Sequence, residues 1–270
     1  LERKITLFHA KIIKELSINN EEILIGFHGQ TIYHNAMEKI SRQLGDGKLL
    51  YQLTKRRIIY NFRENDILNG GEGAPLTPIF HKLIVTQKKI QLPTCILNIG
   101  GISNVTVVGL DELFSKDIGP GNCLIDTWVR KNSKKKFDHN GHLASIGKKN
   151  EIIYEQAQEL YYNRNKEKKS FDTNDFDISF SRGLSLEDGT TTLTEFTGSI
   201  IAETISLLAK NGKTFNNIII CGGGRKNKML MKIIQKNLSQ KIKIKMIEDY
   251  GIDGDFVESK AFAFLAIRSY

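Results

Sequence analysis

The stretch CILNIGGISNVTVVG, residues 95–109, contains two apolar runs separated by the glycine pair Gly100-Gly101. This pattern predicts strands over Thr94–Ile99 and Val105–Leu110, with the chain turning through Ser103-Asn104. Glycine at a strand end removes side chains from the backbone, which lets a ligand, often a phosphate, approach closely. A hairpin with a bulge gives the same pattern, so this stretch alone leaves both interpretations open.

The composition is that of a globular chain with one large domain or two lobes: 270 residues, 40% hydrophobic and 26% charged. It has no apolar run near the roughly 18 residues of a membrane-spanning helix and no secretory signal, so we expect a cytoplasmic protein without a membrane partner. The net charge of +9 is spread over lysine-rich loops and helix faces, without interleaved aromatic residues, which argues against nucleic acid as a partner. No paired Cys or His spacing predicts a metal site.

Apolar periodicity predicts an α/β chain of two lobes, residues 1–90 and 91–270. The elements expected in the first lobe are a helix over Glu2–Leu16, strands over Ile23–Phe27, Leu49–Leu53 and Ile58–Phe62, and a helix over Pro78–Val85. The further elements expected in the second lobe are a strand over Phe114–Ile118, helices near Asn122, Glu151–Tyr162 and Thr190–Asn211, a strand over Ile218–Cys221, a helix over Lys228–Leu238, a strand over Lys241–Ile247 and a helix over Val257–Arg268.

Three predicted strands of the second lobe end in similar turns, NIGGISN, DIGPGN and CGGGRKN. Backbone N–H groups that glycine leaves accessible form anion sites, and three such turns in one lobe favour a polyphosphate ligand. Asp117 ends a strand directly before the turn Gly119-Pro120-Gly121, which makes it a candidate for a catalytic carboxylate. The alternative for Asp117 is a turn or helix-capping role.

Two phosphate-binding designs remain open on these residues. Ile218–Cys221, GGGRKN and Lys241–Ile247 form a plausible Rossmann unit with Glu248 after the second strand, but Asn227 replaces its third glycine and the other two turns stay unexplained. The other design is the arrangement of actin-like ATPases, sugar kinases and Hsp70, in which glycine turns of two lobes clamp ATP.

Seven motifs resemble, in order, those of the anhydro-N-acetylmuramic acid kinase family: GFHGQTIYH, NGGEGAPLTPIFH, LNIGGISNVT, DIGPGNCLIDTW, EDGTTTLTEFT, CGGGRKN and ESKAFAFLA. The resemblance covers nearly the whole chain and implies a two-lobed actin-like ATPase (ribonuclease H-like) fold. The family's GTSxDG loop does not occur, the chain starts at Leu1 without Met, and the family's Thr- and Gly-rich tail is missing after Tyr270. We therefore expect a chain truncated at both ends, with an incomplete first lobe.

The resemblance implies a reaction in peptidoglycan recycling. ATP, water and 1,6-anhydro-N-acetylmuramic acid give N-acetylmuramic acid 6-phosphate and ADP, with Mg²⁺ as cofactor. Asp117 matches the family's base, which takes a proton from the attacking water. The residues expected to bind the nucleotide are Gly100, Gly101, Asn104, Gly119, Gly121 and Asn122, and, beside adenosine, Gly222, Gly223, Gly224 and Asn227.

The sugar is expected to contact residues of the first lobe and of the last helix. His28, Gln30 and Thr31, on a predicted strand-end loop, offer hydrogen-bonding groups. Arg63 suits the lactyl carboxylate of the sugar, or else an ion pair with Glu64 or Asp66. Glu258 matches a substrate-facing carboxylate of the family, or else is an acid at a helix N-terminus. The small-molecule sugar is the expected partner, and a homodimer is compatible with the resemblance.

Two other functions stay open: a non-catalytic nucleotide- or sugar-binding remnant of such a kinase, and an Hsp70- or actin-like ATPase without a sugar substrate. The missing phosphate loop motivates the first, while the HGQT loop and Arg63 argue against the second. Because phosphoryl transfer in this architecture needs donors on both sides of the γ-phosphate, we expect this chain by itself to lack kinase activity.

Overall fold

The computed structural model describes residues 1–16, 23–35, 37–165, 171–213 and 215–270. It divides into two units: residues 1–80 together with 256–270, and residues 81–255. This division differs from the predicted lobes of 1–90 and 91–270, because the chain returns to the first unit for its last helix. Each unit has its own sheets and buried apolar side chains.

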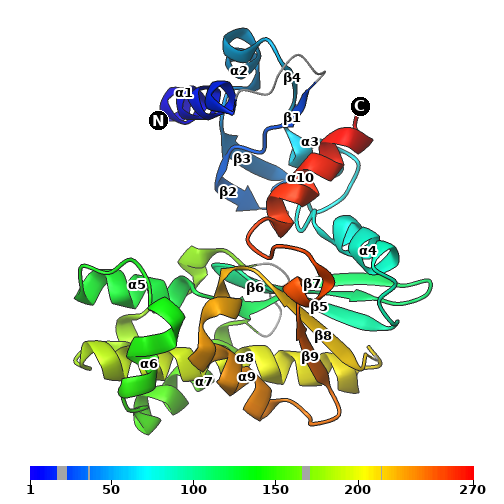
Figure 1. Ribbon diagram of the computed structural model, residues 1–270. Helices are drawn as coiled ribbons and strands as arrows, with labels where there is room; N and C mark the ends of the chain where they lie inside the picture. The colour runs from blue at the N-terminus through cyan, green and yellow to red at the C-terminus, as the bar shows by residue number, and fades with distance from the viewer. Residues whose placement is uncertain (17–22, 36, 166–170, 214) are drawn as a thin grey trace. The chain divides into compact units, whose positions relative to one another are not determined.

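The second unit contains a five-stranded sheet (Figure 1). Its strands, in the spatial order β7-β6-β5-β8-β9, are β7 (Leu113–Pro120), β6 (Ile102–Val108), β5 (Thr94–Ile99), β8 (Asn217–Cys221) and β9 (Lys243–Met246). The first three are antiparallel neighbours, whereas β5, β8 and β9 run parallel. β5 and β8 read as short, mostly apolar runs, as buried strands do, with NIIIC of β8 the clearest case, whereas KIKM of β9 alternates exposed lysines with half-buried apolar residues.

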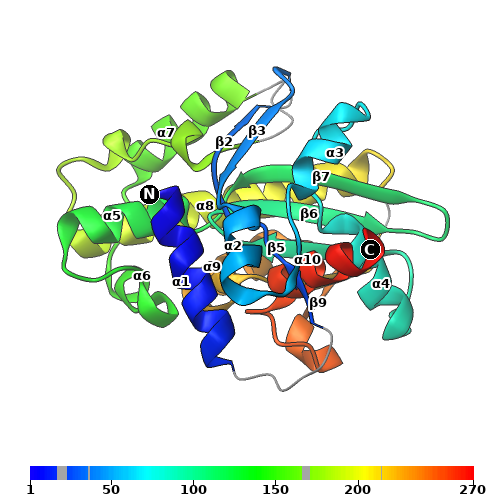
Figure 2. The same cartoon turned by 90° about the horizontal axis from the view of Figure 1, so that it is seen from above.

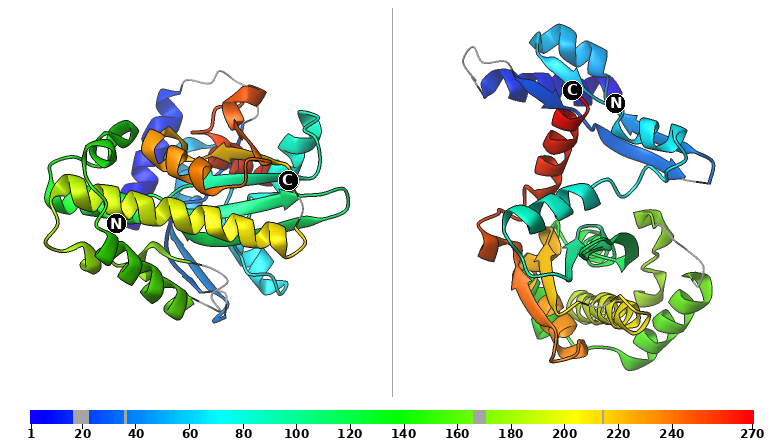
Figure 3. Two further views of the ribbon diagram at one scale, coloured as in Figure 1. Left: turned by 90° about the horizontal axis from the view of Figure 1, so that it is seen from below. Right: turned by 90° about the vertical axis from the view of Figure 1, so that its right-hand side faces the viewer.

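Helices cover both faces of this sheet. α8 (Leu186–Lys210) and α9 (Lys228–Asn237) bury Ile201, Ile205 and Leu230 against β5, β6 and β8, and Figure 3 shows α8 lying along this face. On the other face, His81 of α4 (Pro78–Gln87) is hydrogen-bonded through Nδ1 to Thr106 Oγ1 of β6 at 2.8 Å. Burial lowers the pKa of His81 to about 4, so this side chain is uncharged at neutral pH.

Three further helices pack beside α8 and form a second apolar cluster. They are α5 (Cys123–Asn132), α6 (His142–Ile146) and α7 (Glu151–Asn165). Trp128 of α5 lies in this cluster, and its indole N–H donates to the carbonyl oxygen of Leu186 at 3.0 Å. The single tryptophan of the chain therefore reports on the second unit.

The first unit contains two small sheets: β1 (Leu24–Gly26) pairs in parallel with β4 (Arg57–Ile59), and β2 (Gln30–Asn35) pairs antiparallel with β3 (Ile40–Leu44) (Figure 2). Its helices are α1 (Glu2–Glu15), α2 (Gly47–Thr54), α3 (Phe62–Leu68) and α10 (Val257–Arg268). α10 packs directly on β1, since a Cβ at Gly26 would lie 2.9 Å from the carbonyl oxygen of Phe262.

Two predictions about local structure were wrong, and one hairpin was missed. Leu49–Leu53 is helical, because Asp46 caps α2 by accepting the N–H of Leu49 at 2.9 Å. The hairpin of β2 and β3 was not predicted. The chain turns at Gly100-Gly101 and not at Ser103-Asn104, because β6 already begins at Ile102 and pairs with β5 up to Ser103.

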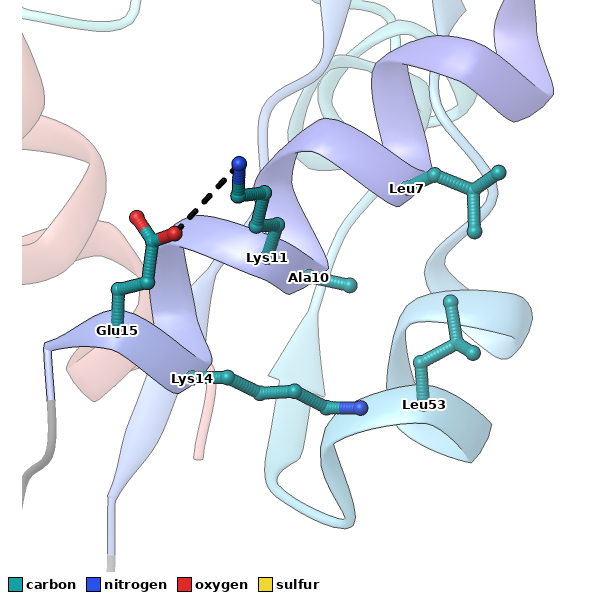
Figure 4. Close-up of a pocket in the computed structure, with 6 residues that line it drawn as sticks. All are labelled: Leu7, Ala10, Lys11, Lys14, Glu15 and Leu53. Carbon is teal, nitrogen blue, oxygen red and sulfur yellow. Dashed lines mark ion pairs between the residues drawn. The ribbon is translucent and has the colours of Figure 1, made fainter.

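An apolar hollow of about 380 Å³ lies between α1 and α2, where Leu7 and Ala10 face Leu53 beside the ion pair of Lys11 and Glu15 (Figure 4). None of the predicted site residues lines it. Within the described ranges, every helix is too short or too polar to cross a membrane.

Candidate active site

The β5–β6 hairpin closes tightly over Gly100-Gly101, with the N–H of Gly100 donating to the carbonyl oxygen of Ile102 at 3.1 Å. The carbonyl groups of both glycines accept hydrogen bonds from the start of α5. Gly121 and Cys123 donate to Gly101 at 2.9 and 3.2 Å, and Asn122 donates to Gly100 from its backbone at 2.8 Å and from its side chain at 3.0 Å. The first two glycine motifs therefore form one interlocked structure, which we call the double turn.

Gly121 is glycine because of this close approach. A Cβ at this position would lie 2.3 Å from the carbonyl oxygen of Gly100, which is far inside van der Waals contact. The backbone N–H groups of Gly121, Asn122 and Cys123 are engaged by protein carbonyls. The sequence pattern suggested these three N–H groups as donors to an anion. In the double turn they instead join two segments of the same chain.

Asp117 lies on β7 next to a β-bulge. Asn104 of β6 pairs with Asp117, but Ser103 pairs with Gly119, so Ile118 has no partner in the ladder. Bulges of this kind redirect neighbouring side chains and are common beside active sites. Asp117 is half-buried, and its Oδ2 accepts the N–H of Phe171 at 3.0 Å.

Asn104 supplies an unsatisfied polar atom beside Asp117. Residues directly opposite each other on antiparallel strands are neighbours on one face of the sheet, which places Asn104 next to Asp117. Among the described residues, no group hydrogen-bonds the buried Oδ1 of Asn104. Because a buried acceptor without a partner is costly, this atom is suited to a ligand donor.

The third glycine motif forms the loop between β8 and α9, which we call the β8–α9 loop. Gly222 has φ +81°, and a Cβ there would lie 2.5 Å from Asn98 Oδ1. A Cβ at Gly224 would lie 2.2 Å from Ile99 Cγ2, whereas one at Gly223 would have nothing within 4 Å. Gly223 is therefore the one glycine of the three with open space beside it. Asn227 is buried and caps α9 by accepting the N–H of Leu230 at 3.0 Å.

All three glycine motifs meet at one edge of the sheet. β5 and β8 run parallel and end there, and β7 ends beside the start of β6. The contacts of Gly222 with Asn98 and of Gly224 with Ile99 join the β8–α9 loop to the end of β5. The carboxyl ends of parallel strands are where open α/β sheets bind ligands. The structure thus brings together every residue predicted to bind the nucleotide, with Asp117 nearby.

In the first unit, His28 and Arg63 are paired. Arg63 donates from Nε to His28 Nε2 at 3.0 Å and from Nη1 to the carbonyl oxygen of Gly73 at 2.7 Å. Burial and, secondarily, the Arg63 charge lower the pKa of His28 to about 4. The imidazole is therefore neutral at pH 7, with Nε2 as acceptor and Nδ1 donating to the carbonyl oxygen of Gly29 at 3.0 Å.

The two carboxylates considered as partners of Arg63 have hydrogen bonds of their own. Asp66 accepts the N–H of Gly73 at 2.7 Å, and Glu64 accepts the side-chain amide of Asn61 at 2.8 Å. Arg63 and Asp66 together hold Gly73 from both sides of its backbone. The HGQT and NGGEG motifs, separate in sequence, thus meet through His28, Arg63 and Gly73.

The other residues predicted to bind sugar are placed differently from each other. Gln30 and Thr31 lie on β2 and not in a loop, so their side chains point to opposite faces, and Thr31 accepts the amide of Gln43 at 3.3 Å. Glu258 is exposed in the first turn of α10, one turn before Phe262. The ring of Phe262 lies 4.2 Å from that of His28, so Glu258 belongs to the helix that covers His28.

Sequence reasoning missed two groups at this site, Phe171 and Arg225. Phe171 contacts Asp117 through its backbone N–H, which no side-chain pattern can indicate. Arg225 stands inside the CGGGRKN motif, but its acidic partners lie 23 and 30 residues further along the chain.

Comparison with known proteins places the chain in a family. All of it, residues 1–270, matches the family model described as "Anhydro-N-acetylmuramic acid kinase". A protein of that name from Pelagibacter ubique (strain HTCC1062) is 55% identical over 278 residues, which cover 100% of this chain and 74% of the relative. Another, from Zymomonas mobilis subsp. mobilis, is 37% identical over 274 residues, which cover 99% of this chain and 73% of the relative.

Among solved structures, the "Activator of the 2-Hydroxyisocaproyl-CoA Dehydratase from Clostridium difficile with bound ADPNP" is 13% identical with a TM-score of 0.43, and the match covers 82% of this chain and 81% of that chain. This likeness is too slight to inform the fold or the ligand. The α/β class is confirmed by the sheets and helices themselves. From the match along its full length and the relatives of 55% and 37% identity, the chain belongs to the anhydro-N-acetylmuramic acid kinase family, as its motifs predict.

Proposed function

We propose that the protein is an ATP-dependent kinase that opens 1,6-anhydro-N-acetylmuramic acid with water and phosphorylates O6, giving N-acetylmuramic acid 6-phosphate and ADP. Its relatives are named for this sugar. The observation that carries the proposal is the position of Asp117 at a bulge, at the sheet edge where three glycine motifs meet.

Asp117 is the proposed base. Water is a weak nucleophile at neutral pH, and a carboxylate that accepts its proton accelerates attack by about 10²–10⁴-fold. The hydrogen bond from the Phe171 N–H to Oδ2 orients the carboxylate. Attack of the water on the anomeric carbon breaks the bond to O6, and the released O6 receives the γ-phosphoryl group.

The nucleotide is proposed to lie along the sheet edge. The open space at Gly223 admits a ligand close to the backbone, and the unsatisfied Oδ1 of Asn104 offers an acceptor. The described residues contain no group of three or more His, Cys, Asp or Glu side chains suited to hold a metal. Mg²⁺ is commonly held by nucleotide phosphates, water and one or two carboxylates, and it would neutralise charge during transfer.

The sugar is proposed to bind at the His28–Arg63 pair of the first unit. The Arg63 guanidinium suits the lactyl carboxylate, since arginine can bind a carboxylate with two parallel hydrogen bonds, and it lies beside the neutral imidazole of His28. Reaction in the cytoplasm, where ATP is supplied, is part of the proposal. Two expectations about partners remain predictions: that the protein binds neither nucleic acid nor membrane, and that it forms a homodimer.

The test is Asp117→Asn, which preserves shape and removes the proton acceptor. ADP release with the anhydro sugar should fall at least about a hundredfold, while ATP binding is kept. Asp111→Asn, on an exposed loop, is the matched control and should leave turnover unchanged. Both variants are assayed in a chimera with the preceding residues of the Pelagibacter ubique relative, because this chain by itself is expected to lack kinase activity.

The outcomes separate the alternatives. Retained turnover in Asp117→Asn would make another carboxylate the base, with Glu258 the first to examine. No turnover in the chimera with unaltered Asp117 would favour a non-catalytic remnant. ADP release that does not depend on the sugar would favour an ATPase of another kind.

A further inference from the structure

Arg225 belongs to the β8–α9 loop, and only 7% of its side chain is exposed. Its Nη1 donates to the carbonyl oxygen of Gly222 at 2.8 Å and to Asp255 Oδ1 at 2.8 Å, and its Nε donates to Glu248 Oε1 at 2.7 Å. One guanidinium thus joins a glycine of the loop to two carboxylates on the segment that follows β9.

The surrounding backbone is shaped around this guanidinium. A Cβ at Gly254 would lie 2.5 Å from Arg225 Nε, and the N–H of Gly254 donates to Glu248 Oε1 at 3.3 Å. A lysine ammonium, as a point charge on a flexible stem, cannot reproduce three directed bonds of a planar fork. The arrangement therefore requires arginine.

The bond to Gly222 has a geometric consequence for Gly223. The peptide between them is trans and planar, so the Gly222 carbonyl and the Gly223 N–H point in opposite directions. Arg225 Nη1 holds the carbonyl, and Gly222 lies so close to Asn98 and Ile99 that a Cβ there would be 2.5 Å from Asn98 Oδ1 and 2.6 Å from the Ile99 carbonyl oxygen. The direction of the Gly223 N–H is thereby fixed, at the one glycine with open space beside it.

We propose that Arg225 is a positioning residue for the nucleotide, acting through the Gly222–Gly223 peptide; this rests on the proposed function. Arg225 has three carboxylates within 4.0 Å of its guanidinium, those of Glu248, Asp253 and Asp255. The positive charges of this cluster are those of Arg225 and Lys226, so negative charge is in excess. This excess of negative charge disfavours phosphate. The peptide therefore serves the nucleoside part of the ligand, which ATP and ADP share.

The test compares Arg225→Lys with the matched control Lys226→Gln. Lys226 is exposed and pairs with Asp255 but has no contact with the Gly222 carbonyl in the described network. Binding of ATP and of ADP, each with Mg²⁺, is measured by calorimetry in the whole chain. Arg225→Lys should weaken both by the same factor, about tenfold for loss of a charged hydrogen bond, and Lys226→Gln by less than about twofold.

Further measurements separate positioning from general loosening. In the chimera with the Pelagibacter ubique residues, Arg225→Lys should raise the KM for ATP while kcat and the KM for the sugar stay near their original values. Glu248→Gln, which weakens the Arg225 anchor and leaves the bond to Gly222, should give a smaller loss of about threefold and serves if Arg225→Lys does not fold.

An Arg225→Lys variant that binds ATP and ADP as tightly as the unaltered protein would overturn the inference. So would a loss of affinity that is confined to ATP or that extends to the sugar. If the unaltered protein binds neither nucleotide, the proposed function itself fails, which is a separate result.

Discussion

The double turn and the β8–α9 loop look alike in sequence, yet their glycines serve different purposes. In the double turn, the N–H groups of Gly121, Asn122 and Cys123 donate to the carbonyls of Gly100 and Gly101. In the β8–α9 loop, two glycines are packed against the end of β5 and Gly223 faces open space. A glycine motif at a strand end therefore indicates that another group comes close to the backbone. In the double turn this group is another segment of the chain, and in the β8–α9 loop we propose that it is a ligand.

The largest effect is expected for Gly121→Ala. Its Cβ would meet the Gly100 carbonyl oxygen at 2.3 Å, and separating the two turns should cost about 1–3 kcal/mol of unfolding free energy. Urea unfolding followed by Trp128 fluorescence measures this in the second unit. Unchanged stability would show that the fold does not depend on contact between the two turns, which would contradict the structural role of the glycines in the double turn.

Gly223→Ala should separate binding from stability. With nothing within 4 Å of the new Cβ, unfolding free energy should change by less than about 0.5 kcal/mol, while ATP affinity falls about tenfold, or about 1.4 kcal/mol. Gly224→Ala is the control, since its Cβ would lie 2.2 Å from Ile99 and should destabilise the fold. Full ATP affinity in Gly223→Ala would place the nucleotide elsewhere.

Gly100→Ala is expected to change stability as little as Gly223→Ala. Its Cβ would lie 3.4 Å from the Ile102 carbonyl oxygen, an ordinary contact, so the change should stay within about 0.5 kcal/mol. Paired urea unfolding and ATP titration then ask whether the hairpin also touches the nucleotide. A loss of stability as large as that of Gly121→Ala would contradict the ordinary contact distance at Gly100.

Strong local patterns predicted elements of both units. The bounds of β5 and α10 were predicted to the residue, because apolar runs with clear ends leave little choice. Leu49–Leu53 failed because its apolar residues suit either a strand or a helix, and the Asp46 cap decided for the helix. The β2–β3 hairpin lacks the alternation that reveals a half-buried strand, since its residues are mostly polar.

The site was predictable as a set of residues, and less so as geometry. The glycine motifs could be found by pattern, and Asp117 by its place before one of them. The engaged N–H groups of the double turn depend on pairing between segments, which no single stretch encodes. The meeting of His28 with Arg63, 35 residues apart, is likewise a product of folding.

The return of the chain to the first unit at Phe256 bears on how the protein is made. Residues 81–255 are continuous and leave the ribosome before α10, so the second unit can fold during synthesis. The first unit cannot: β1 must wait for a helix encoded more than two hundred residues later to cover Gly26. The usual order, in which the N-terminal part of a nascent chain folds first, is reversed here. Chaperones would therefore meet residues 1–80 in an incompletely folded state, and His28 would gain its aromatic neighbour only after Phe262 has been synthesised.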